Sequence, residues 1–175
     1  MEEEPVESFS VFISSSQEEF ERLRTNLRDA INAEEFARQR IMRAVLVEEK
    51  RGSVIRTDIE KGIDGYAIYV GIFGQVYSDW TAYGFRMARM RGLPLLVYRF
   101  RRQKGRGRPR KHDGRGRRSK VEVFLEDEAK RFDIRVRGPY SSENSLEDAM
   151  LTDLALQVAD MVAEIATVRK VTHRS

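Results

Sequence analysis

The chain is 175 residues long, carries a formal net charge of +4, and contains no cysteine and only two histidines, His112 and His173. One domain with a sizeable core fits this length. The missing cysteines exclude disulfides, thiolate nucleophiles and Cys-based zinc sites, the positions of the two histidines argue against a two-His metal site or a Ser-His-Asp triad, and no cofactor is expected. No apolar run is long enough to span a membrane, and the acidic tail at residues 1–7 does not resemble a secretory leader, which together predict a cytoplasmic protein.

The chain begins with an apolar strand over residues 8–14 and a helix behind it. The serines from Ser14 to Ser16 join the two, and Ser16 and Glu19 have the spacing of a capping box at the start of the helix. Backbone N–H groups and hydroxyls at such a turn can also hold an anion, so these serines either cap the helix or belong to a ligand site. A second strand is expected within residues 41–47, and a further helix over residues 53–63.

The stretch from Tyr66 to Phe100 reads as a βαβ unit. Residues 66–73 are apolar or aromatic without alternation, which favours a parallel strand covered on both faces. Gly74 ends this strand, Asp79 is placed to cap the next helix, and Gly92 and Pro94 end that helix. Residues 94–98 form another buried strand.

Residues 101–120 are a concentrated basic insert, with eleven Lys or Arg and one Asp, or +10, against 21 basic and 27 acidic residues, or −6, elsewhere. The sequence from Lys104 to Lys111 matches the AT-hook pattern, in which an extended Arg-Gly-Arg-Pro enters the minor groove of A·T-rich DNA. The insert lacks apolar residues, so it is expected to be disordered alone. DNA is the preferred partner, and RNA binding or a merely solubilising loop are the alternatives. The expected contacts are Lys104, Arg106, Gly107, Arg108, Pro109, Arg110, Lys111, Arg115, Arg117 and Arg118.

Two more helices and a short strand follow the insert. Residues 121–132 predict a helix with Phe124 and Phe132 turned inward, residues 134–136 a short edge strand, and Gly138-Pro139 a break. Ser145 is placed to cap a last long helix, whose apolar stripe is expected to dock on the sheet. A homodimer through this stripe is the alternative.

The alternation of elements predicts an α/β fold, a three-layer flavodoxin-like sandwich with a five-stranded, mainly parallel sheet in the order 2-1-3-4-5. Residues 8–100 and 121–170 form the single domain. A ligand is then expected outside the carboxyl ends of strands one and three. The candidate ligand-binding residues are Ser14, Ser15, Ser16, Gly74, Tyr77, Trp80 and Thr81. Tyr77 and Trp80 would stack on a base, or else close the core.

The opening V-F-I-S-S at residues 11–15, together with Ile68 to Gly74, Tyr77-Ser78 and residues 81–94, resembles a TIR-like family of uncharacterised domains often joined to signalling ATPases. The helix at residues 79–88 is also similar to two catalytic segments. One is the S-x-W-C-x-x-E helix of TIR domains that cleave NAD, and the other is the D-x-G-T-A-F-E-L-G-Y-A helix of nucleoside deoxyribosyltransferases.

Both resemblances place the essential glutamate at position 84, where this chain has Gly84. Breaking an N-glycosidic bond builds positive charge on the ribose carbon, which a carboxylate must stabilise. The sequence therefore predicts a non-catalytic TIR-like domain that senses a nucleotide or binds a partner. The alternative is a nucleoside or NAD glycosidase, or a deoxyribosyltransferase-like enzyme, that uses Asp79 instead.

Overall fold

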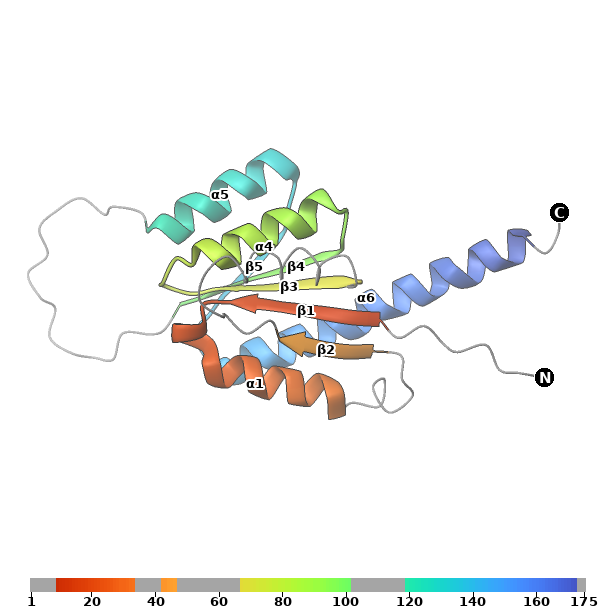
Figure 1. Ribbon diagram of the computed structural model, residues 1–175, viewed down its shortest axis with the longest axis horizontal. Coiled ribbons are helices and arrows are strands. Elements are labelled where there is room, and N and C mark those ends of the chain that lie inside the picture. The colour runs from red at the N-terminus through yellow and green to blue at the C-terminus, as the bar shows by residue number, and fades with distance from the viewer. Residues whose placement is uncertain (1–8, 34–41, 47–66, 102–118, 173–175) are drawn as a thin grey trace, which may run out of the picture.

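The computed structural model describes residues 9–33, 42–46, 67–101 and 119–172, in which strands alternate with helices (Figure 1). The expected helix at residues 53–63 and most of the basic insert lie outside these ranges. The elements are β1 Phe9–Ser15, α1 Gln17–Ala33, β2 Met42–Leu46, β3 Ile68–Phe73, α4 Asp79–Met90, β4 Leu95–Phe100, α5 Lys120–Phe132, β5 Val136–Tyr140 and α6 Glu143–Thr172.

The strands form one parallel sheet in the order β2-β1-β3-β4-β5, the order expected from the sequence. The four strands β2, β1, β3 and β4, which are neighbours in that order, pair in continuous register. β5 joins the edge of β4 with a register shift between Tyr98 and Phe100. The parallel α/β architecture explains the unbroken apolar runs in the sequence, because helices bury both faces of such a sheet.

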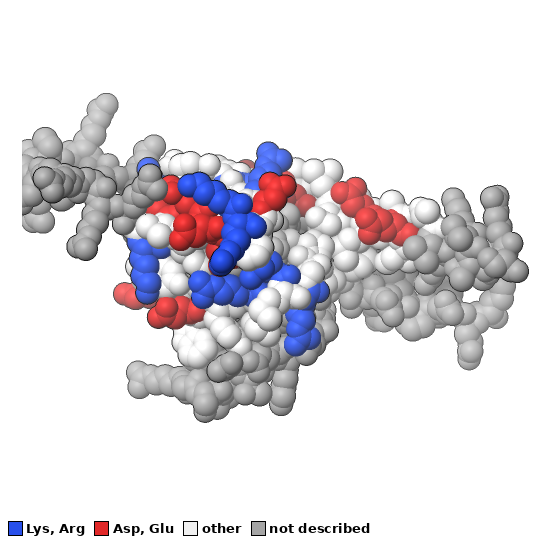
Figure 2. Space-filling model, turned by 90° about the horizontal axis from the view of Figure 1, so that it is seen from above, with Lys and Arg blue, Asp and Glu red and all other residues white. Residues whose placement is uncertain are grey.

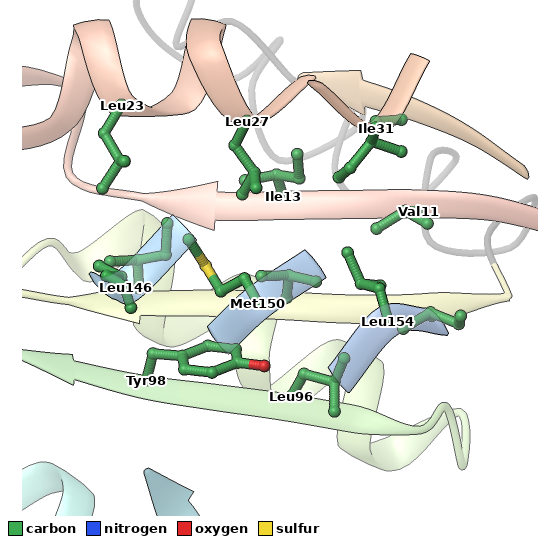
Figure 3. Close-up of a cluster of buried hydrophobic side chains, with 14 of the residues drawn as sticks. Val11, Ile13, Leu23, Leu27, Ile31, Leu96, Tyr98, Leu146, Met150 and Leu154 are labelled. Carbon is green, nitrogen blue, oxygen red and sulfur yellow. The ribbon is translucent and has the colours of Figure 1, made fainter. Parts of the chain in front are cut away.

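Alternate residues of each strand supply two cores, one on each face of the sheet. On β1, Val11 and Ile13 face α1 and α6, whereas Phe12 faces α4 and α5. Figure 3 shows the first core, in which apolar side chains of α1 and α6 meet those of β1 and β4. Aromatic rings fill the second core, where Phe85 contacts Tyr69, Phe73 and Phe124 edge-on.

The elements after the insert depart from the sequence expectations. β5 begins at Val136 and runs through Gly138 and Pro139, which were expected to break the chain. Proline is tolerated there because β5 is the last strand of the sheet, where one side needs no ladder partner. Phe132 is 38% exposed rather than buried, and the Arg89 guanidinium lies 3.5 Å from its ring centre.

Helix α6 starts at Glu143, before the expected cap at Ser145, because Ser142 accepts the first hydrogen bonds through its carbonyl and hydroxyl. Its buried stripe, Leu146, Met150, Leu154 and Val158, docks on the sheet. The sequence predicted a stripe from Leu151 to Val168 instead, and of its members whose side chains the structure describes only Leu154 and Val158 are buried, while Leu151 and Met161 are partly buried and Ile165 is exposed. The C-terminal part of α6 runs past the end of the sheet (Figure 1), and the apolar residues Val162 and Ile165 in it are exposed.

Candidate functional site

The carboxyl ends of β1 and β3 lie side by side, since Ser14 pairs with Gly71 and Ser15 with Ile72 in the parallel register. Ser16 follows β1, and Gly74 follows β3. The structure therefore gathers the predicted ligand residues of both strands at one rim. In an open parallel sheet this is the place where ligands bind.

The three serines at this rim are buried, with exposed fractions of 8% for Ser14, 3% for Ser15 and 6% for Ser16. Ser14 hydrogen bonds with the hydroxyl of Tyr69, while burial, the larger influence, raises the pKa of that tyrosine above its usual range. The Ser16 carbonyl accepts the Phe20 N–H at 3.0 Å and so begins α1. The Ser15 hydroxyl is buried without a hydrogen-bond partner, which is uncommon in folded proteins.

Glu19 does not complete the capping box expected from its spacing to Ser16. Its carboxylate instead reaches across to the loop after β3. There its oxygens accept the Gln75 N–H at 2.8 and 2.9 Å and the Val76 N–H at 3.0 Å. Consecutive backbone N–H groups of this kind form a concave anion-binding site. The anion that this site holds is a side chain of the same protein.

Gly74 makes room for this arrangement, because a Cβ atom at position 74 would overlap the Glu19 carboxylate. The carbonyl groups of the same loop are held from the opposite direction by Arg99. Its guanidinium donates to the Gly74 carbonyl and, at 3.1 Å, to the Phe73 carbonyl. The loop is therefore fixed through both its N–H groups and its carbonyl groups.

Arg99 and Glu122 are two site residues that the sequence analysis missed. Arg99 is only 9% exposed, and burial lowers the pKa of its guanidinium, while nearby Glu122 opposes that shift. Glu122 lies 3.8 Å from Arg99 and forms a closer ion pair with Arg101. The backbone N–H of Ser119, and then Arg101, lower the pKa of Glu122, which therefore keeps its charge further into acid. The sequence did contain a signal for Arg99, because it is the one charged residue in the otherwise apolar or aromatic strand β4.

Asp79, the alternative catalytic residue, is the first residue of α4 and lies at the surface. Its side chain is 86% exposed, and its Oδ1 lies 3.7 Å from the Lys120 ammonium. Nor does Asp79 cap α4 as expected. Ser78 is the cap, and its hydroxyl accepts the Thr81 N–H at 3.2 Å.

Gly84 lies at the buried face of α4, against β1. A Cβ atom there would be 3.4 Å from the Phe12 ring and 3.5 Å from the Ser14 hydroxyl. A side chain at position 84 would thus extend toward the carboxyl end of β1. The residue that both resemblances expect to be a glutamate faces the rim but brings no carboxylate to it.

The aromatic residues predicted to stack on a base, Tyr77 and Trp80, are partly buried and pack against the second core. The Tyr77 ring contacts Phe124 edge-on and has the Lys120 ammonium 4.0 Å from its centre. Trp80 packs edge-on against Tyr83. Thr81 is 2% exposed, and its carbonyl accepts the Tyr69 hydroxyl at 3.3 Å. The Thr81 hydroxyl itself is buried without a partner.

The predicted nucleic-acid contacts from Lys104 to Arg118 lie outside the described residues. Within the described ranges, no three His, Asp or Glu side chains gather to hold a metal ion. The helices of that same part include none long and apolar enough to cross a membrane.

Comparison with known proteins gives a likeness of fold. No family model matches the chain, and no curated protein matches it. A chain in the crystal structure of the RPS4 and RRS1 TIR domain heterodimer is similar, with a TM-score of 0.51 and 13% sequence identity. The match covers 85% of this chain and 96% of that one. The parallel sheet flanked by helices is therefore a TIR-like fold.

Proposed function

We propose that the chain is a non-catalytic TIR-like interaction domain with a nucleic-acid-binding arm at residues 101–120. The position of Gly84 carries the first half of this proposal. Position 84 has no side chain, although a Cβ atom there would lie 3.5 Å from the Ser14 hydroxyl. Without that carboxylate α4 brings no group to the rim that stabilises charge on a ribose carbon, and the one carboxylate described there, Glu19, is already bound by the Gln75 and Val76 N–H groups.

Glu19 supports a partner-binding role over free nucleotide binding. A nucleotide phosphate that used the Gln75 and Val76 N–H groups would have to displace a carboxylate held by both of them. Hydrogen bonds to a charged group are worth roughly 1.5–3 kcal/mol each. A nucleotide therefore remains a weaker candidate ligand than a macromolecule that contacts the rim from outside.

The second half of the proposal comes from the sequence of the insert. Its net charge of +10 contrasts with the rest of the chain. On the face of the folded domain seen in Figure 2, Lys and Arg lie interspersed with Asp and Glu rather than gathered in one basic patch. The arm is thus the better polyanion-binding surface, and its AT-hook pattern favours A·T-rich DNA over RNA.

Binding assays test the arm directly. The full chain is compared with a variant in which residues 102–118 are replaced by a Gly-Ser linker of equal length. We expect A·T-rich duplexes to bind the full chain more tightly than G·C-rich duplexes or single-stranded RNA, and none to bind the variant well. If six or more phosphates are neutralised, affinity falls about a thousandfold or more between roughly 50 and 200 mM salt. Equal binding by both proteins would refute the proposal that the arm binds nucleic acid.

An N-glycosidase is the second candidate, and Glu19 favours it more than Asp79 does, because its carboxylate lies at the rim. Chromatography of NAD and deoxynucleosides after incubation separates the two functions. We expect no turnover. Turnover that disappears in Glu19→Gln or in Asp79→Asn would replace the proposal with an enzyme.

Self-association through α6 is a further part of the proposal. The similar structure is a heterodimer of TIR domains. Here the far half of α6 exposes Val162 and Ile165, at 45% and 41%. Light scattering of wild type and of a Val162→Glu/Ile165→Glu variant tests this, with a dimer expected only for wild type. A monomeric wild type would rule out this part.

A further inference from the structure

The two ends of the basic insert meet at one carboxylate of the folded domain. Arg101 directly follows β4, and its backbone N–H donates to the Tyr140 carbonyl at 2.7 Å. Ser119 directly precedes α5 and caps it. Between them lie the 17 residues from 102 to 118. What holds Arg101 and Ser119 therefore fixes the point from which the insert leaves the domain.

Glu122 contacts both of these residues. One of its carboxylate oxygens, Oε1, forms an ion pair with the Arg101 guanidinium. The other, Oε2, accepts the Ser119 N–H at 3.0 Å, and the Glu122 N–H donates to the Ser119 hydroxyl at 3.2 Å. A capping box requires only the contacts with Ser119. The contact with Arg101 is additional and joins the cap of α5 to the end of β4.

A second, exposed ion pair lies at the start of α5. Lys120, the last cation of the insert, lies 3.7 Å from Asp79 and packs over the Tyr77 ring. Arg99 connects Glu122 to the end of β3 through the Phe73 carbonyl. The Lys120 and Asp79 side chains are 69% and 86% exposed, so this ion pair is a surface contact between the starts of α5 and α4 and adds little to stability.

We propose that Glu122 is a positioning residue for the basic arm, a clasp that ties Arg101 to Ser119 so that the arm leaves the rim from one fixed base. This inference rests on the proposed nucleic-acid binding of residues 101–120. A fixed base leaves fewer conformations for binding to remove, which raises affinity without a new contact. Charge alone predicts the opposite effect, since an acidic residue beside the arm repels phosphates.

A pair of charge-matched variants separates the two effects. Glu122→Ala and Asp127→Ala each remove one negative charge from α5, taking the net charge from +4 to +5. Asp127 is exposed on the same helix. The clasp predicts that Glu122→Ala binds A·T-rich duplex DNA roughly three- to tenfold more weakly than Asp127→Ala. Glu122→Gln, which keeps the shape of the side chain, is expected to lie between them. Tighter binding by Glu122→Ala than by Asp127→Ala would overturn the clasp.

Amide hydrogen exchange of the full chain without DNA gives a readout that does not depend on the proposed function. In Glu122→Ala we expect faster exchange at the Arg101 N–H as well as at Ser119 and in the first turn of α5. If exchange becomes faster only at Ser119 and in that first turn, Glu122 acts as a simple helix cap, and this result would also overturn the clasp. If wild type binds neither DNA nor RNA, the proposed function of the arm fails, while exchange at Arg101 still decides whether the base is tied.

Discussion

The carboxylate of Glu19 lies against the Cα of Gly74, at a place where any Cβ atom would overlap it. The two residues are 55 positions apart in the chain, and each accommodates the other. The glycine leaves the space, and the glutamate fills it while accepting the next two N–H groups of the loop. This contact fixes the loop after β3 to the start of α1 and occupies the rim.

We predict that Gly74→Ala destabilises the protein by about 1.5–3 kcal/mol, because the new methyl group expels a carboxylate that makes charge-assisted hydrogen bonds. Chemical denaturation measures this. Glu19→Ala should cost a similar amount, and the double variant should cost little more than either alone, since both changes break the same contact. Additive losses would show that the two residues act separately.

Position 84 responds differently to a small and to a charged side chain. Gly84→Ala should be neutral or stabilising by up to about 1 kcal/mol, because alanine favours a helix interior more than glycine does and the nearest atoms stay at least 3.4 Å away. Gly84→Glu should cost on the order of 3 kcal/mol, because it buries an unpaired carboxylate between α4 and β1. Urea unfolding of both variants checks this. A stable Gly84→Glu protein would indicate an open space at the rim.

In addition to the backbone pairing of β5 with β4, one carboxylate of α6 contacts a side chain of each of these two strands. The Tyr98 hydroxyl donates to Asp153 at 2.6 Å, and Arg137 of β5 forms an ion pair with the same oxygen. We predict a loss of about 1–2 kcal/mol for Tyr98→Phe and about 3 kcal/mol or more for Asp153→Ala, which leaves both partners unpaired. Asp148→Ala, an exposed change on α6, is the control. Equal unfolding energies for the two Asp variants would contradict this role.

The sequence predicted the sheet order and the βαβ unit because those features rest on local signals. Runs of buried residues such as Ile68–Phe73, and turn residues such as Gly92, are visible in the chain. It also predicted that Ser14 and Gly74 lie at one rim, since the carboxyl ends of adjacent parallel strands must meet.

The side-chain contacts at that rim were beyond the sequence, because they join distant positions. Glu19 fits a capping box by spacing, and nothing local shows that a loop 56 residues away offers it two N–H groups. Asp79 fits a helix cap in the same way, yet Ser78 takes that role. Arg99 and Glu122 are interpretable only once β4 and α5 are adjacent.

Alkaline pH tests the buried tyrosines of the two cores. Burial raises the pKa of Tyr69 and of Tyr98 above the usual range, so both stay protonated in the folded protein where an unfolded tyrosine ionises, near pH 10. Above that pH the folded state binds more protons than the unfolded state, so stability falls as pH rises, by up to about 1.4 kcal/mol per pH unit for each group. Their contribution is complete below pH ~10.

We therefore expect the unfolding free energy of wild type, measured in urea from about pH 9 to pH 11, to fall more steeply than that of Tyr69→Phe. Phenylalanine has no proton to lose, so the difference between the two curves isolates this group from the lysines that titrate in the same range. Tyr69→Phe also loses the 3.3 Å hydrogen bond to the Thr81 carbonyl. The loss of this bond lowers the unfolding free energy by the same amount at every pH, so the difference in slope still reports the ionisation of Tyr69 alone. Tyr98→Phe should flatten the curve in the same way, and the double variant most. Parallel curves for wild type and Tyr69→Phe would mean that this hydroxyl ionises freely, and hence that the α4 face of the sheet opens to water.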